Sequence, residues 1–86
     1  MSEKEVIDKI YELKSFAVKI QEYEVAGRLR DIENSFTNSK HTKVHIEPTE
    51  ENLKIELNKM FEYFNKYTPK SQFLRHLKLI LLLNEI

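Results

Sequence analysis

Residues 6–33 read VIDKIYELKSFAVKIQEYEVAGRLRDIE, a pattern that predicts two helices joined by a short polar corner. Apolar side chains recur at every third or fourth position, which places them on one face of a helix. They are Val6, Ile10, Leu13, Ala17 and Ile20 before the corner, and Ala26, Leu29, Ile32 and Phe36 after it. The corner, Gln21-Glu22, leaves only two or three residues in which the chain can reverse. We therefore expect residues 1–36 to form an antiparallel helical hairpin.

The corner and the helix after it resemble the core of the UVR motif. The resemblance rests on Gln21-Glu22-Tyr23-Glu24, Ala26-Gly27, Leu29-Arg30-Asp31 and Glu33. The motif occurs in the excision-repair proteins UvrB and UvrC, in the middle-domain hairpin of ClpC-type unfoldases and in the regulators that bind them. Glu33 is closer to the ClpC-type variant. In those families the hairpin contacts other proteins and does no chemistry, so over about residues 6–36 the resemblance implies a docking module.

The resemblance also implies a candidate partner-binding set on the second helix. Its members are Tyr23, Glu24, Arg28, Arg30 and Asp31. Arginine is over-represented among the residues that dominate binding energy at protein interfaces. A plainer interpretation is a solvated face with local pairing, since Glu24 and Arg28 have the i,i+4 spacing of a helical ion pair. On that interpretation Tyr23 packs over the hairpin corner.

Gly27 departs from the motif, in which alanine is commoner at this position. Glycine in the interior of a helix costs about 1 kcal/mol relative to alanine. We expect the missing side chain to permit close approach of the facing helix.

Residues 49–86 predict a second hairpin, joined to the first by a linker at residues 37–48. The third helix has an apolar face of Leu53, Leu57, Met60, Phe61, Phe64 and Tyr67. The expected fold is all-α, with four helices in two hairpins that form one small bundle and a single structural domain. Helix should exceed about 65% of the residues, well above the usual third. Val44 and Ile46 alternate with polar residues in the linker, which we expect to lie against the helices.

Three helix starts have recognisable capping residues. Ser2 and Glu5 match a capping box. Thr49 is the expected N-cap of the third helix. Thr68 followed by Pro69 matches the start of a helix that has proline in its first turn, so we expect the last helix to run from residue 69 to about 85.

The last helix is apolar around its whole circumference between Leu79 and Leu83. A surface helix normally has one apolar stripe about 100° wide. Two interpretations follow: the helix is the central element of the bundle, or one side meets a second chain. We expect a homodimer whose contact comprises Phe73, Leu79, Leu82, Leu83 and Ile86.

Composition excludes several classes of function. The chain of 86 residues has no cysteine and one glycine, so disulfides, thiolate chemistry and glycine-rich phosphate loops are excluded. Fourteen basic and fourteen acidic residues balance, so the net charge argues against binding to nucleic acid or lipid surfaces. His41 and His45 have metal-ligand spacing only if their segment is helical, and we expect no metal or cofactor. Without a signal peptide or a spanning segment, a cytoplasmic protein is expected.

The sequence therefore predicts a non-catalytic interaction protein rather than an enzyme. By resemblance, the partner is a ClpC-type unfoldase or one of its regulators. The alternative in the same class is an accessory factor that binds a subunit of the nucleotide-excision-repair complex. The alternative in another class is a small helical nucleic-acid-binding protein, for which Lys70, Arg75 and Lys78 at the start of the last helix would matter most.

Overall fold

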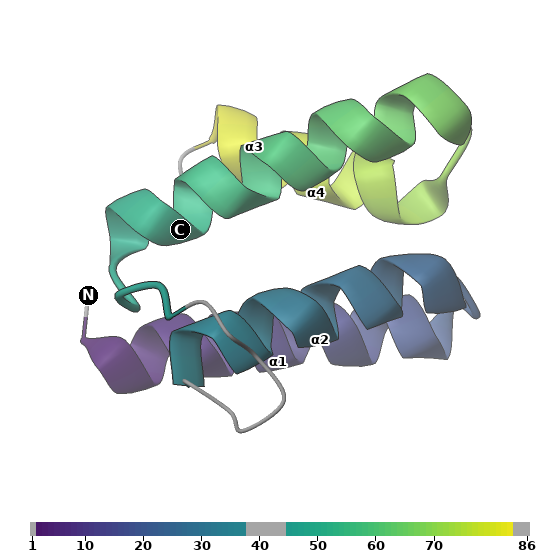
Figure 1. Cartoon of the computed structure of the whole chain (residues 1–86). Helices are drawn as coiled ribbons and strands as arrows, with labels where there is room; N and C mark the ends of the chain where they lie inside the picture. The colour runs from purple at the N-terminus through teal and green to yellow at the C-terminus, as the bar shows by residue number, and fades with distance from the viewer. Residues whose placement is uncertain (1, 38–44, 84–86) are drawn as a thin grey trace.

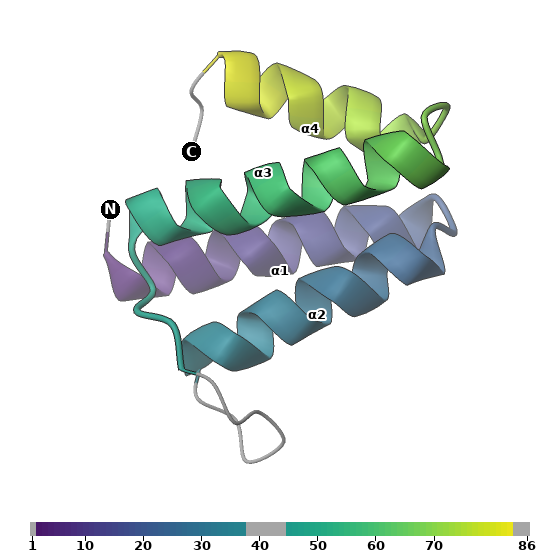
Figure 2. The same cartoon turned by 45° about the horizontal axis from the view of Figure 1, so that its top comes forward.

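The computed structural model describes residues 2–37 and 45–83 as four helices in two layers. One layer pairs α1 (Glu3–Lys19) with α2 (Tyr23–Thr37), and the other pairs α3 (Glu50–Tyr67) with α4 (Gln72–Leu82) (Figure 1). Successive helices run in opposite directions (Figure 2). Of the described residues, 81% are helical and none lies in a strand. The expected all-α bundle of two hairpins is confirmed.

The α1–α2 corner is built on a residue with left-handed backbone geometry. Gln21 has a φ of 63°. Its N–H donates to the carbonyl of Val18 at 3.0 Å, and the N–H of Glu22 donates to the carbonyl of Ala17 at 2.9 Å. These two bonds form a Schellman motif, which satisfies carbonyls that the end of a helix would otherwise leave free. The predicted tight reversal therefore has a defined hydrogen-bonded geometry.

Two of the three predicted helix starts are confirmed. Ser2 Oγ accepts a hydrogen bond from the backbone N–H of Glu5 at 3.2 Å, and the hydroxyl donates to the Glu5 carboxylate at 3.2 Å. Glu5 thus reaches back to the serine side chain. Thr49 Oγ1 accepts from the N–H of Asn52 at 3.1 Å. In both cases a side-chain oxygen satisfies an N–H group that has no partner within the helix.

The prediction that Thr68 and Pro69 begin the last helix is wrong. Thr68 ends α3 instead, and its hydroxyl donates to the carbonyl of Phe64 at 3.0 Å. The N-cap of α4 is Ser71, and the helix begins at Gln72. A threonine before a proline satisfies the rules for a helix start, but here its side chain is engaged by the preceding helix.

A carboxylate from the other hairpin explains the later start. Glu22, at the α1–α2 corner, accepts a hydrogen bond from the Ser71 hydroxyl and another from the N–H of Phe73 at 3.1 Å. The negative charge lies at the end of α4 where the helix dipole is positive. α4 ends at Leu82 with Leu83 as its C-cap, about three residues before the predicted end near residue 85.

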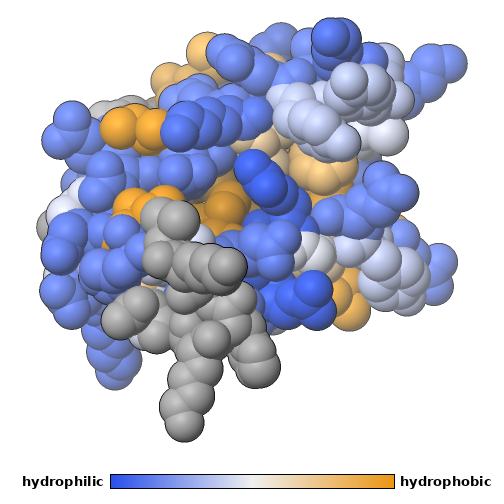
Figure 3. Space-filling model, in the orientation of Figure 1, coloured by the Kyte–Doolittle hydropathy of each residue, from blue (hydrophilic) through white to orange (hydrophobic). Residues whose placement is uncertain are grey.

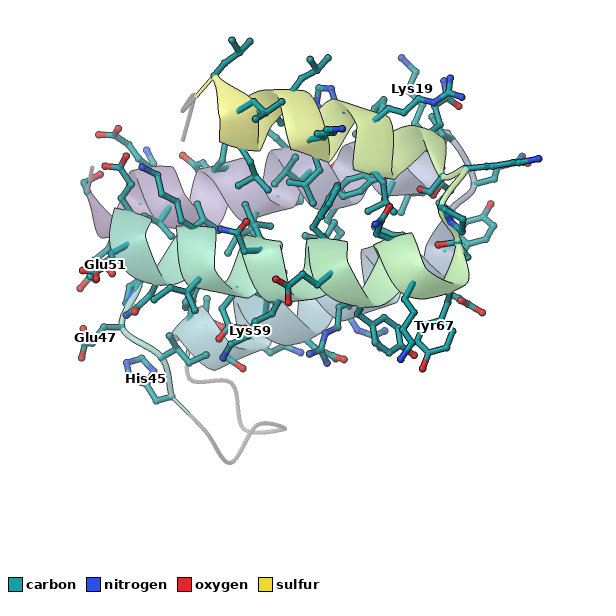
Figure 4. The ribbon with its side chains drawn as sticks, turned by 90° about the horizontal axis from the view of Figure 1, so that it is seen from above. Lys19, His45, Glu47, Glu51, Lys59 and Tyr67 are labelled. Atoms are coloured by element: carbon teal, nitrogen blue, oxygen red, sulfur yellow. The ribbon has the colours of Figure 1, made fainter. Side chains whose placement is uncertain are left out.

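All four helices contribute to one core. Its buried residues are Val6, Ile10, Leu13, Ala17, Val25, Ala26, Leu29, Ile32, Phe36, Leu53, Leu57, Met60, Phe64, Phe73, Leu74, Leu77 and Ile80. The apolar stripes expected for the first three helices are largely confirmed, but Tyr67 is not buried. It projects from the C-terminal end of α3 and is 62% exposed (Figure 4). In the space-filling view, apolar residues show in the seam between the two layers (Figure 3).

The described end of the linker lies against the helices, as expected. The N–H of Ile46 donates to the carbonyl of Ser35 at 2.9 Å, and the Ile46 side chain packs partly buried on the core. Pro48 is buried. Val44, the other apolar residue of the linker, lies outside the described residues. This arrangement leads the described part of the linker into the start of α3.

Candidate functional site

The exposed side of α2 carries the partner-binding residues predicted from the sequence. All five are exposed: Tyr23, Glu24, Arg28, Arg30 and Asp31. The core residues of α2, including Leu29 and Ile32, face the opposite direction. Tyr23 is 63% exposed, which argues against its expected role of packing over the hairpin corner. The structure therefore brings these residues to one side of a single helix.

A hollow on the α3 side of α2 gathers four of these five residues. It has a volume of about 530 Å³. Its lining residues are Glu24, Gly27, Arg28, Arg30 and Asp31 from α2, with Tyr63 and Phe64 from α3. The ring of Tyr63 contacts Phe64 edge-on, with centroids 5.1 Å apart. Charged residues of both signs thus surround an aromatic wall.

A second hollow lies on the other side of α2, between α1 and α2. We call it the α1–α2 groove, and its volume is about 430 Å³. Its lining residues are Tyr11, Lys14, Ser15 and Val18 from α1, with Tyr23, Ala26, Gly27 and Arg30 from α2. On each helix these positions have the spacing i, i+3, i+4, i+7, which is one straight stripe. No residue of α3 or α4 lines the groove.

Gly27 and Arg30 border both hollows. An added Cβ at Gly27 would meet nothing within 4 Å. The expectation that Gly27 permits close approach of a facing helix is therefore wrong, because the space above it is open. Within the described structure the glycine serves no packing purpose.

The basic residues of this surface differ in whether they form an ion pair. Lys14 is held by Glu33, with Nζ and Oε1 2.8 Å apart, and its ammonium lies 5.2 Å from the centre of the Tyr11 ring. The ion pairs among the described residues include neither Arg28 nor Arg30. The helical pair expected between Glu24 and Arg28 is not formed. Both arginine side chains are also exposed.

The predicted dimer surface on α4 divides into two groups. Leu79, Leu82 and Leu83 are 57%, 71% and 64% exposed, and their spacing places them on one side of the helix. Phe73 is a correction, because it is fully buried in the core and offers no surface to a second chain. Ile86 lies outside the described residues. The exposed part of the predicted contact is thus a patch of three leucines.

The described residues do not assemble a metal site or a spanning helix. They contain no group of three or more histidine, aspartate or glutamate residues placed to hold a metal ion. His45 lies 3.9 Å from the Glu47 carboxylate, and the ring of His76 packs against Phe16 with centroids 4.7 Å apart. His41 lies outside the described residues. No helix in the described ranges is long and apolar enough to cross a membrane.

The sequence interpretation missed the residues that shape the two hollows. Tyr11 and Val18 line the groove, and Tyr63 lines the hollow beside α3. A signal for the first two exists. They lie seven residues apart on the first helix, off the face that carries its core residues, so they form a second stripe that the bundle does not bury. Tyr63 has no comparable signal, because its place opposite α2 depends on how the layers stack.

Comparison with known proteins finds no family model that matches the chain, and no curated protein or solved structure significantly similar to it. The resemblance to the UVR motif therefore rests on the residues quoted for it above.

Proposed function

We propose that this protein is a non-catalytic interaction module that docks a partner protein on the exposed side of α2. The observation that carries the proposal is the state of Arg28 and Arg30. Both are exposed, neither forms an ion pair with another described residue, and each borders a hollow with an aromatic wall. Arginine beside an aromatic pocket is typical of the residues that dominate binding energy at interfaces.

The resemblance to the UVR motif supports two partner classes. One is a ClpC-type unfoldase or a regulator of such an unfoldase, and the other is a subunit of the excision-repair complex. Both classes are consistent with a role in which the hairpin supplies contacts and the partner supplies the chemistry. The proposal takes the protein to be cytoplasmic, where both classes of partner work.

The leucine patch on α4 supports self-association as a second property. Leu79, Leu82 and Leu83 place three large apolar side chains in water on one side of a short helix. Burying such a side chain contributes about 1.5–3 kcal/mol. A two-fold homodimer would bury the same patch from both copies, because such an interface is self-complementary.

Charge reversal separates the proposed docking role from the fold. Arg28→Glu and Arg30→Glu should each abolish affinity capture of the native partner from a lysate of the source organism, identified by mass spectrometry. Thermal unfolding should stay nearly unchanged, since exposed substitutions usually change stability by less than about 0.5 kcal/mol. Leu29→Ala is the contrasting variant, because Leu29 is fully buried and its truncation should destabilise by about 2 kcal/mol or more.

Capture at full strength by both arginine variants would show that the hairpin is only a scaffold. The identity of the captured protein distinguishes the two partner classes. An unfoldase or its regulator supports the first, and a subunit of the repair complex supports the second.

A further inference from the structure

We infer that the α1–α2 groove binds one helix of the partner, and that this helix carries large aliphatic anchors flanked by acidic residues. The inference deepens the proposed function and rests on it. The partner inserts at the groove, the inserting segment is a helix, and that helix carries negative charge.

The shape of the groove matches a helix. Its walls are two antiparallel stripes, each covering eight residues, or about 10 Å from first to last at 1.5 Å per residue. Side chains at i, i+3, i+4 and i+7 form the ridges between which the side chains of another helix fit. The hairpin thus has one side covered by α3 and α4, and another that offers the same kind of packing surface to a helix from outside.

The volume of the groove suits aliphatic anchors. A cavity of roughly 150 Å³ is enough to hold one benzene ring. The groove, at about 430 Å³, has room for two side chains of leucine size. Val18 and Ala26 contribute apolar surface to its lining, together with the exposed rings of Tyr11 and Tyr23. Amphipathic helices bind such grooves through a few apolar anchors on one face.

Gly27 supports an occupant that comes from outside the chain. Glycine is an unfavourable residue for a helix interior, and alanine would fit here without any clash. No contact within the described structure compensates for that disadvantage. The open space above Gly27 lets another backbone or side chain approach α2 closely, which is one of the common uses of glycine.

The charges of the groove favour an acidic helix. Its lining includes Lys14 and Arg30 and no carboxylate. Lys14 is already paired with Glu33, so Arg30 is the charge that remains for a partner. Complementary charges give an interface its specificity and speed its association.

A second copy of this chain fits the groove less well. The available helix would be α4 with its exposed leucines, but Arg75 and Lys78 are also exposed on that helix. They would bring further positive charge toward Arg30. Like charges brought together across an interface suppress binding, so the groove is assigned to a different, acidic partner.

Two synthetic peptides test the inference on the full chain. Both are helical and carry the same leucine stripe; one has glutamate on either side of the stripe and the other has lysine. At low salt we expect the glutamate peptide to have an affinity at least about tenfold higher than that of the lysine peptide. In nuclear magnetic resonance titrations, the backbone amides of Tyr11, Val18 and Gly27 should shift most.

Three variants locate the binding. Arg30→Glu should remove the preference for the glutamate peptide. Gly27→Leu should weaken binding of the glutamate peptide by about tenfold, because the new side chain fills the groove. Leucine has a higher helix propensity than glycine, so α2 should remain folded in this variant. Asn65→Leu, which adds the same side chain at an exposed position of α3 away from the groove, should bind as the unmodified chain does.

The outcomes are separable from those for the proposed function. Equal binding of both peptides, absence of binding, shifts that map to α4, or full binding by Gly27→Leu would each overturn the groove assignment. If arginine reversal still prevents capture of the native partner in that case, the docking role stands and the partner binds elsewhere on α2. If native capture is insensitive to the arginines, the docking role itself fails.

Discussion

At the scale of single residues, the α1–α2 corner depends on one unusual backbone conformation. Gln21 adopts a positive φ that residues other than glycine, asparagine and aspartate rarely take. Left-handed helical geometry costs a residue with a side chain about 1–2 kcal/mol. The Schellman hydrogen bonds hold Gln21 in that geometry, so the corner keeps its conformation despite the energetic cost at Gln21.

Gln21→Gly should therefore stabilise the protein. Glycine removes the cost of the left-handed geometry. It also increases the entropy of the unfolded chain, which lowers the free energy of unfolding by about 0.5–1 kcal/mol. We expect a net gain of about 0.5 kcal/mol, corresponding to a rise of a few degrees in the melting temperature measured by circular dichroism. Gln21→Ala is the control, since it keeps the penalty and should give no rise. A lower melting temperature for the glycine variant would contradict this account of the corner.

At the scale of the helices, α4 is stabilised from outside its own hairpin. It has only 11 residues, which is short for a helix that must hold together by local interactions. The Glu22 carboxylate accepts hydrogen bonds from Ser71 and from the N–H of Phe73, 51 positions away in the sequence. The corner of one hairpin thus caps the first turn of the other, and the two layers are joined by more than the apolar core.

Glu22→Ala should destabilise the fold by about 1–2 kcal/mol, the usual cost of losing an N-terminal helix cap. Urea denaturation followed by circular dichroism measures the free energy of unfolding. Glu24→Ala is the matched control, two residues further along and exposed, with no hydrogen bond to α4 among the described contacts. If the two variants lose the same stability, the cap does not contribute as we infer.

This cap also shows where reasoning from the sequence ends. Periodicity predicts the helices and their buried faces, and local capping rules predict Ser2 and Thr49, because those signals lie within a few residues of one another. The start of α4 is missed because Glu22 and Ser71 are distant in the sequence. The candidate docking residues on α2 were predicted as a set, whereas the groove that they border appears only when α1 and α2 lie side by side.

At the scale of the whole molecule, the bundle measures 32 × 27 × 22 Å and leaves part of its apolar surface unburied. The sequence shows that residues 79–83 of the last helix are apolar on every side, but it does not show which side meets the core. The structure resolves this, because Phe73, Leu77 and Ile80 face inward. Exposed apolar residues that gather on one side of a molecule mark interaction surfaces more often than isolated ones do.

We expect the α4 patch to form a two-fold homodimer at high protein concentration. Light scattering should give a mass that rises with concentration toward twice the 10.3 kDa of one chain. Leu82→Asp and Leu83→Asp should each keep the mass at that of one chain, because a carboxylate buried without a partner opposes association. Both residues are exposed, so the circular dichroism spectrum and melting temperature of the monomer should remain close to those of the unmodified chain.

The control for that experiment lies on the other layer of the bundle. Val18→Asp places the same charge at an exposed apolar position of α1, within the α1–α2 groove and away from α4. It should leave the dimer intact, since the two surfaces serve different partners. A constant mass of one chain at all concentrations, with Leu83→Asp indistinguishable from the unmodified protein, would show that the leucines do not mediate self-association. Loss of the dimer in Val18→Asp alone would instead place the contact between copies in the groove, and would contradict the assignment of that groove to an acidic partner.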